Sequence, residues 1–189
     1  MVKTEPIKNK RDAARLLNYY LDKENYRNYL LIAIGLFTAL RISDILSMKW
    51  SDVLSRDGSV CEKLYIREKK TGKINEISVN CELAEAISIY AEEVSDKTGY
   101  IFKGRNPEKP LHRTQAYRIV KAAVKALGLK GNISAHSLRK TVGYRIYERG
   151  CSPILIMKIY NHSSFEITKR YLCIDQYEKD KVFMELSYD

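Results

Sequence analysis

The stretch HSLRKTVGYRIYERGCSPILIMKIYNHSSFEITKRYL, residues 136–172, contains the start and end signals of three consecutive helices. The first helix is predicted over Ser137–Arg149, and Gly150 closes it because glycine readily adopts the left-handed conformation that ends many helices. Ser152 then caps the second helix, with Pro153 at its first position, where a missing amide hydrogen costs nothing. These signals predict two helices separated by a very short turn.

The second helix is predicted to end at Tyr160, because Asn161 follows and asparagine tolerates a left-handed helix end nearly as well as glycine. Ser163–Glu166 has the capping-box pattern, which predicts a third helix reaching about Leu172. His162 therefore stands in the corner between two helices, nine residues before Tyr171.

Upstream, apolar residues show helical spacing except in one segment, where Leu64 and Ile66, and later Ile77 and Val79, alternate with polar residues around a basic turn. This alternation predicts a β-hairpin with a charged tip. Helices are predicted at Asn9–Leu21, Tyr26–Thr38, a short segment from Ile42 to Leu46 with Arg41 at its start, Glu82–Ser95 and Arg113–Leu127, with a short tail helix over Gln176–Leu186. We expect a mainly α-helical fold with one small antiparallel β-hairpin, in a single domain spanning residues 1–189.

The chain has 33 Lys and Arg against 23 Asp and Glu residues, a formal charge of +10. This excess favours a polyanionic partner such as DNA, or an anionic membrane surface, although a merely basic globular protein would show it too.

The longest apolar run, Tyr29–Phe37, is far shorter than the ~20 residues of a membrane span. The N-terminus has no export pattern, and the four cysteines form no CxxC pair, which favours reduced thiols, no metal site and a cytoplasmic location.

Only three histidines occur, and two of them lie at helix boundaries beside other polar groups. His136 and Arg139 are three residues apart at a helix start, so their side chains share one side of the helix. His162 follows a helix end and precedes the helix that carries Tyr171. Titratable residues collected at such boundaries are typical of a functional site.

Each feature taken singly also has a purely structural explanation. Arg41 would pair with Asp44 one helical turn later, and Tyr171 is one of 14 tyrosines, most of which pack in cores or on surfaces. The basic tip of the hairpin would be a solvated turn. The active-site interpretation is favoured only when these features are taken together and in order.

Five segments resemble the short sequence motifs, or boxes, that carry the catalytic residues of the tyrosine recombinase (phage integrase) family, and they occur in the family's order. They are Thr38–Leu46 around Arg41, Lys70–Lys73 followed by Glu76–Val79, His136–Thr141, Asn161–Ser164 and Thr168–Tyr171. The resemblance covers nearly the whole chain and implies the catalytic-domain fold of that family. The catalytic set that it implies is Arg41, Lys70, His136, Arg139, His162 and Tyr171.

The resemblance also implies a reaction: Tyr171 attacks a DNA phosphodiester, giving a 3′-phosphotyrosyl link and a 5′-hydroxyl. Arg41 and Arg139 would hold the non-bridging oxygens, since guanidinium groups match phosphate geometry. Because cationic side chains supply the positive charge, neither a metal ion nor any other cofactor is expected.

The remaining catalytic roles concern protons. Lys70 would protonate the leaving oxygen, His162 would donate a hydrogen bond to the phosphate, and His136 would assist proton transfer at the tyrosine. Lys69 and Lys73 flank Lys70 on the same turn, and counting back from the second strand favours Lys70.

The chain departs from the family pattern at two positions. Asn161 stands where the family usually has glycine, a change that keeps a left-handed helix end accessible. Lys140 replaces a frequent histidine after the second arginine and keeps a hydrogen-bond donor there. Asp44 is expected to orient Arg41 or an adjacent group.

The expected partner is double-stranded DNA, gripped through phosphate contacts of Lys69, Lys73, Arg118, Lys121 and Lys125. A solvated helix face explains the last three equally well. The resemblance implies a homo-oligomer on DNA, from dimer to tetramer, with Val182, Phe183 and Leu186 docking on a neighbour or packing back on their own domain.

The family's N-terminal DNA-clamping domain is expected to be absent, because only 40 residues precede Arg41, so the chain is expected to be either a natural short recombinase or an excised catalytic fragment. The expected function is site-specific DNA recombination. The alternatives are DNA relaxation of the type IB topoisomerase kind and a DNA-binding regulator on a recombinase fold.

Overall fold

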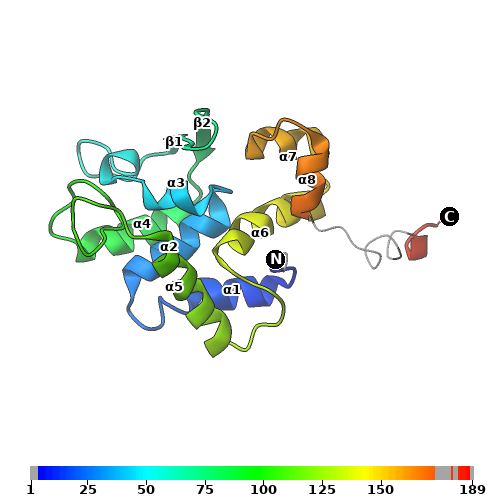
Figure 1. Cartoon of the computed structure of the whole chain (residues 1–189), viewed down its shortest axis with the longest axis horizontal. Helices are drawn as coiled ribbons and strands as arrows, with labels where there is room; N and C mark the ends of the chain where they lie inside the picture. The colour runs from blue at the N-terminus through cyan, green and yellow to red at the C-terminus, as the bar shows by residue number, and fades with distance from the viewer. Residues whose placement is uncertain (1–3, 173–179, 181–182, 188–189) are drawn as a thin grey trace.

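The computed structural model describes residues 4–172, 180 and 183–187, apart from the side chains of Phe165, Lys169, Arg170 and Tyr171. The elements in this part of the chain are α1 (Lys10–Asn18), α2 (Tyr26–Phe37), α3 (Ile42–Leu46), η1 (Trp50–Asp52), β1 (Lys63–Arg67), β2 (Ile74–Ser78), α4 (Cys81–Glu93), α5 (Arg113–Ala126), α6 (Ala135–Glu148), α7 (Pro153–Tyr160) and α8 (Phe165–Leu172). The predicted fold class, mainly helical with one antiparallel hairpin, is confirmed (Figure 1). Most of the predicted tail helix over residues 176–186 lies outside the described residues.

Helix α2 runs through the main core, which explains why its sequence is apolar on every side. The side chains of residues 30–34 are completely buried, and α1, α4 and α6 pack around them (Figure 1). Gly35 faces Leu138 of α6, where an added Cβ atom would lie only 2.6 Å from Leu138 Cδ1. Glycine therefore allows the two helices to cross closely, which brings the start of α6 beside the end of α2.

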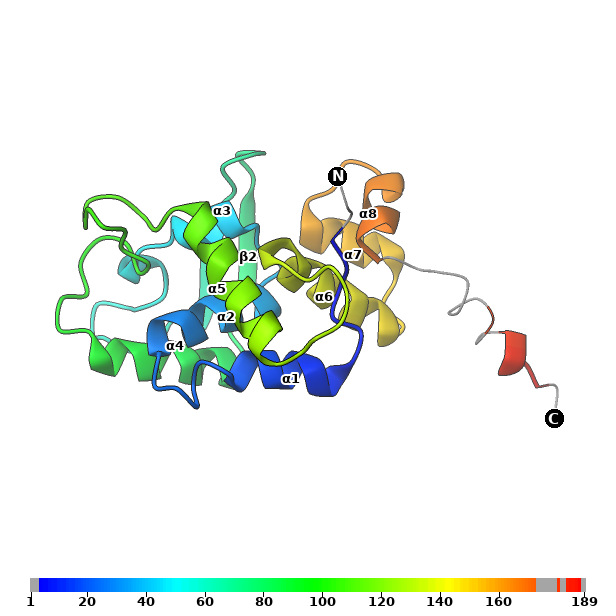
Figure 2. The ribbon, with the colours of Figure 1, turned by 60° about the horizontal axis from the view of Figure 1, so that its bottom comes forward.

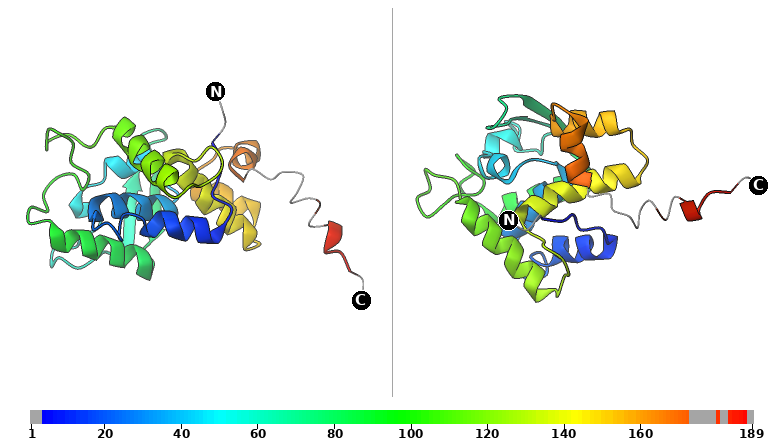
Figure 3. Two further views of the ribbon diagram at one scale, coloured as in Figure 1. Left: turned by 90° about the horizontal axis from the view of Figure 1, so that it is seen from below. Right: turned by 45° about the vertical axis from the view of Figure 1, so that its right-hand side comes forward.

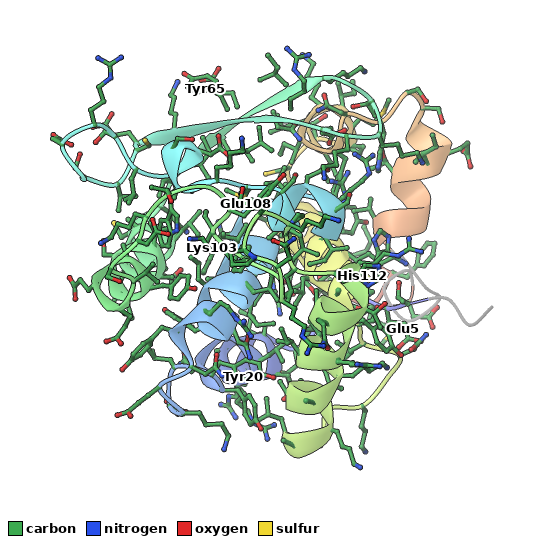
Figure 4. The ribbon with its side chains drawn as sticks, turned by 60° about the vertical axis from the view of Figure 1, so that its left-hand side comes forward. Glu5, Tyr20, Tyr65, Lys103, Glu108 and His112 are labelled. Carbon is green, nitrogen blue, oxygen red and sulfur yellow. The ribbon has the colours of Figure 1, made fainter. Side chains whose placement is uncertain are left out.

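The β-hairpin follows the predicted alternation. Leu64 pairs with Ile77 and Ile66 with Asn75, and both β1 residues of these pairs are buried. Tyr65, between them, is 60% exposed and lies on the outer side of the hairpin (Figure 4). The hairpin thus places its inner face against the helices and extends its basic tip beyond them.

Helices α6, α7 and α8 form a second packing group with its own small apolar core, built from Ala39, Ile156, Tyr160 and Leu172. Gly143 of α6 makes this packing possible, because an added Cβ atom would overlap the ring of Tyr160. Figure 3 shows α7 and α8 lying on α6, on the side of the molecule that carries the hairpin.

Most predicted helix boundaries are confirmed within a few residues. Ser152 caps α7, and Asn161 ends it in the left-handed conformation with φ of 53°. Helix α8 begins at Phe165, within two residues of the start that the Ser163–Glu166 pattern predicts. Residues 4–8 run along α6, held by a hydrogen bond from Ile7 N–H to Thr141 Oγ1 of 2.8 Å (Figure 2).

In the described part of the chain no helix is long and apolar enough to cross a membrane. The same residues contain no group of three or more His, Cys, Asp or Glu side chains placed to hold a metal ion.

Candidate active site

Arg41 is positioned by the sharp exit of the chain from α2. Ala39 adopts a left-handed conformation with φ of 55°, which is unfavourable for a residue with a Cβ atom and is typical of functional sites. Arg41 then caps α3, and its Nη1 lies 2.5 Å from Glu68 Oε2, with 18% of the arginine side chain exposed. The predicted alternative, an ion pair between Arg41 and Asp44, is wrong: the partner is Glu68, 27 residues along the chain.

Arg139 projects from the first turns of α6 into the space between α2 and α7. Its Nη1 donates to Ala39 O at 2.5 Å and its Nη2 to Tyr160 O at 3.1 Å, while its guanidinium carbon lies 4.7 Å from the centre of the Tyr160 ring. The side chain is 1% exposed. Two carbonyls and one ring therefore fix its orientation without any ligand.

Glu68 connects the two arginines, and the sequence-based prediction missed it. Its carboxylate is completely buried and lies 3.9 Å from Arg139 Nη1 in addition to its contact with Arg41. Burial raises the pKa of this carboxyl group, but hydrogen bonds from Thr71 and Arg41 and the charge of Arg41 outweigh burial and hold the pKa below its ordinary value. The alternation of Leu64, Ile66 and Glu68 was the available signal, because it puts an acidic residue on the inner face of a strand.

The basic turn after β1 is held against α3. Lys69 N–H donates to Asp44 Oδ1 at 3.1 Å, and Gly72 N–H donates to Glu68 O at 2.9 Å, with Gly72 at φ of 68°. Asp44, which was expected to orient Arg41 or a neighbour, instead holds the backbone of the turn. The side chains of Lys69, Lys70 and Lys73 are all exposed.

The charge of Arg139 acts on both predicted histidines. His136 is the second residue of α6, and burial, followed by the charges of Lys140, Arg139 and Arg41, lowers its pKa to about 4. The pKa of His162 is also lowered to about 4, first by burial and then by Arg139 and Arg41. Both imidazoles are therefore neutral at pH 7 in the DNA-free protein.

His162 is fixed by the corner in which it stands. Its ring stacks on Tyr160 with centroids 5.0 Å apart, and its Nδ1 lies 2.9 Å from Thr168 Oγ1 of α8. Tyr171 is the last residue but one of α8, on a helix that packs against both α6 and α7. The helix that carries the predicted nucleophile is thus tied directly to the second histidine.

Lys140, the second departure from the family pattern, contributes to the fold. Its side chain is 4% exposed, and its Nζ donates to Thr4 O at 2.6 Å. Lys140 therefore anchors residues 4–8 along α6.

The predicted DNA-contacting stripe on α5 is only partly exposed. Arg118 and Lys125 are exposed, whereas Lys121 is half-buried, with its Nζ 5.8 Å from the centre of the Tyr117 ring and 3.5 Å from Asn132 Oδ1. The helix begins at Arg113, directly after His112, whose side chain caps it by accepting from Thr114 N–H (Figure 4). None of the three basic residues contacts the arginine pair in the described structure, so the stripe stays a prediction.

A family model described as "Phage integrase family" matches residues 9–178. The chain belongs to the phage integrase family. Among curated relatives of this integrase, "Probable integrase/recombinase YoeC" of Bacillus subtilis is 38% identical over 172 residues, which is 91% of each chain. "Type 1 fimbriae regulatory protein FimE" of Escherichia coli is 30% identical over 150 residues, or 77% of this chain and 73% of FimE.

The fold of the integrase is that of solved tyrosine recombinases. A crystal structure of XerA recombinase superposes with a TM-score of 0.79 at 19% identity, covering 99% of this chain and 68% of XerA. The XerH recombinase bound to its palindromic difH substrate gives a TM-score of 0.74 at 20% identity, covering 98% of this chain and 54% of XerH. The predicted family and its catalytic-domain fold are therefore confirmed.

Proposed function

We propose that this integrase catalyses site-specific DNA recombination, cutting and rejoining strands through a covalent link to Tyr171. The Tyr171 oxygen bonds to the scissile phosphorus, the bond from phosphorus to the 5′ oxygen breaks, and that oxygen takes a proton to become a 5′-hydroxyl. The tyrosyl ester retains the energy of the broken bond, so a second 5′-hydroxyl can reverse the step without a nucleotide cofactor. The names of the relatives, integrase and recombinase, favour this reaction over DNA relaxation or regulation without chemistry.

The observation that carries this proposal is the convergence of two arginines, two neutral histidines and a lysine turn from elements far apart in the sequence. Arg41 and Arg139 supply positive charge for the non-bridging oxygens, and a neutral His162 donates a hydrogen bond to the same phosphate. Lys70 is the acid for the leaving oxygen, and neutral His136 is able to take the tyrosine proton.

Arg139 sets a condition on how DNA binds. Because its side chain is 1% exposed, a phosphate reaches it only after neighbouring groups move. Arg41, at 18%, is open to a ligand without such movement. We therefore expect the phosphate to meet Arg41 first and Arg139 as the site closes around it.

The proposal is tested with nicked suicide duplexes made from DNA flanking the gene, in which the cleaved fragment diffuses away and traps the intermediate. The wild-type protein and Tyr171→Phe are compared on a denaturing gel in the presence of EDTA. A slow-migrating adduct with wild type alone supports the proposal. An adduct with Tyr171→Phe would show that another residue is the nucleophile, and DNA binding without an adduct in either protein would contradict the reaction.

We propose double-stranded DNA and further copies of this chain as partners, and an enzyme that acts on DNA is expected in the cytoplasm. A lambda integrase structure is of a dimer on a core site, at 21% identity and a TM-score of 0.71. In this chain Phe183 and Leu186 are 71% and 56% exposed, which leaves both side chains accessible to a neighbouring copy, whereas Val182 lies outside the described residues.

A groove of about 430 Å³ between β2, α6 and α7, lined in part by Phe37, Val142, Ile146 and Ile159, is an apolar acceptor for such a tail from a neighbouring copy. Deletion of residues 176–189 should abolish protein contacts between copies on DNA while leaving binding of one copy intact. Unchanged assembly of the truncated protein on a two-site duplex would contradict docking of the tail.

A further inference from the structure

One oxygen atom of Glu68 accepts hydrogen bonds from two parts of the proposed site, the phosphate-binding arginine and the lysine-bearing turn. Oε2 accepts from Arg41 Nη1 at 2.5 Å and from Thr71 Oγ1 at 2.6 Å. Arg41 belongs to the phosphate clamp, and Thr71 is the residue directly after Lys70 on the exposed turn. The carboxylate therefore fixes the distance between the clamp and the residue next to the proposed acid.

The second oxygen prevents the carboxylate from swinging. Oε1 accepts from Asn75 Nδ2 at 2.9 Å, and Asn75 Oδ1 in turn accepts from Asn161 Nδ2 at 2.6 Å. Asn161 is the left-handed residue that ends α7 directly before His162. Its amide gives this chain a contact that the glycine usual in the family would not make.

A completely buried carboxylate is costly in any fold unless charges and hydrogen bonds compensate it. The turn that Glu68 holds is exposed from Lys69 to Lys73, so burial contributes little to fixing its position. Two hydrogen bonds tie this turn to buried carboxylates in the described structure: Lys69 N–H donates to Asp44 Oδ1, and Thr71 Oγ1 donates to Glu68 Oε2. Of these two, the bond to Glu68 is the one that a side chain of the turn makes.

We propose that Glu68 is a positioning residue that sets Lys70 against the phosphate clamp by holding Thr71 and Arg41 with the same oxygen. The proposal rests on the proposed function, in which Lys70 protonates the leaving oxygen. Glu68 does not touch the reacting atoms; it acts through the position of the turn.

The test separates proton donation from every other contribution by changing the leaving group. In DNA with a sulfur in place of the bridging 5′ oxygen, the thiolate leaves without a proton, so the acid is not needed. Thr71→Val removes the bond to Glu68 at an exposed position and keeps the shape of the side chain. Its matched control is Thr98→Val, which removes an equally short Thr–carboxylate bond, 2.6 Å to Asp96, on a distant loop.

We expect Thr71→Val to cleave ordinary DNA on the order of tenfold more slowly than wild type and the sulfur substrate within twofold of it. Thr98→Val should match wild type on both substrates. Glu68→Gln, if it folds, should show the same rescue by sulfur. Equal slowing on both substrates, or no slowing on ordinary DNA, would overturn the proposal.

Lys70→Met distinguishes failure of the two proposals. Rescue of Lys70→Met by sulfur without rescue of Thr71→Val would overturn the role of Glu68 and leave the function standing. No rescue of Lys70→Met would remove Lys70 as the acid, and the role of Glu68 with it. Absence of a wild-type adduct on either substrate would contradict the function itself.

Discussion

Arg139 and Lys70 belong to the same proposed catalytic set but are held in opposite ways. Arg139 is 1% exposed, fixed by the carbonyls of Ala39 and Tyr160 and by an aromatic ring. Lys70 is exposed on a turn that side-chain oxygens of Asp44 and Glu68 hold in place. The proposed phosphate clamp at Arg139 is therefore part of the folded core, whereas the proposed acid Lys70 lies on a solvent-exposed turn that is tied to that core. Substitution of Arg139 should therefore lower both the free energy of unfolding and the rate of DNA cleavage. Substitution of Lys70 should lower the rate of DNA cleavage alone.

The largest effect is expected for Arg139→Lys. A lysine retains the charge but cannot donate to both carbonyls, so cleavage should fall by about 10²–10³-fold and the free energy of unfolding by about 2–3 kcal/mol. Suicide-substrate kinetics and urea denaturation measure the two quantities. Arg41→Lys is the matched control, with a similar loss of rate but no more than about 1 kcal/mol of stability, since its side chain reaches solvent. Equal losses of stability would remove the distinction between the two arginines.

The complementary change is Lys70→Met. Cleavage of ordinary DNA should fall by about 10²–10³-fold because the leaving oxygen lacks its acid, while the free energy of unfolding stays within about 0.5 kcal/mol of wild type. Lys69→Met and Lys73→Met are internal controls on the same turn and should lose only a few-fold. A greater loss at either of them would move the acid to that position.

A smaller effect is expected from pH. The pKa values of His136 and His162 are lowered to about 4 in the folded protein, below the ordinary value near 6.5 of an unfolded chain. The unfolded state therefore binds more protons between these values, so stability is complete above about pH 6.5 and is lost as the pH falls toward 4. Urea denaturation at several pH values should show this slope, reduced in His162→Gln and unchanged in a control His112→Gln. An unchanged slope in His162→Gln would show that this histidine is not desolvated.

The smallest effect is expected on α5, far from both regions. Lys125→Ala should weaken DNA binding several-fold and reduce the slope of log K against log salt by about 0.9, the value for one lost phosphate contact. Lys121→Ala should do less, because its ammonium group already contacts Tyr117 and Asn132. Exposed Lys97, on another loop, serves as the control. The same affinity and salt slope for Lys125→Ala and wild type would remove this helix from the DNA interface.

Local signals in the sequence were enough to predict where the helices and the β-hairpin lie along the chain. Gly150, Ser152, Pro153 and Asn161 end and begin helices where predicted, because capping depends on neighbours within one turn. Strand alternation likewise placed Leu64 and Ile66 inside the hairpin. The ordered family segments identified Arg41, Arg139 and both histidines as a set, and the fold brings them together.

Only the tertiary structure decided which groups hold the site. Arg41 pairs with Glu68 across 27 residues and Arg139 donates to Ala39 O across 100, distances along the chain over which no periodic pattern carries information. The choice of Glu68 over Asp44 as the partner of Arg41 depends on where the hairpin packs, which local propensity does not specify. The sequence predicted which residues the chemistry needs, and packing determined how each of them is held, because burial and partner choice arise only when distant segments meet.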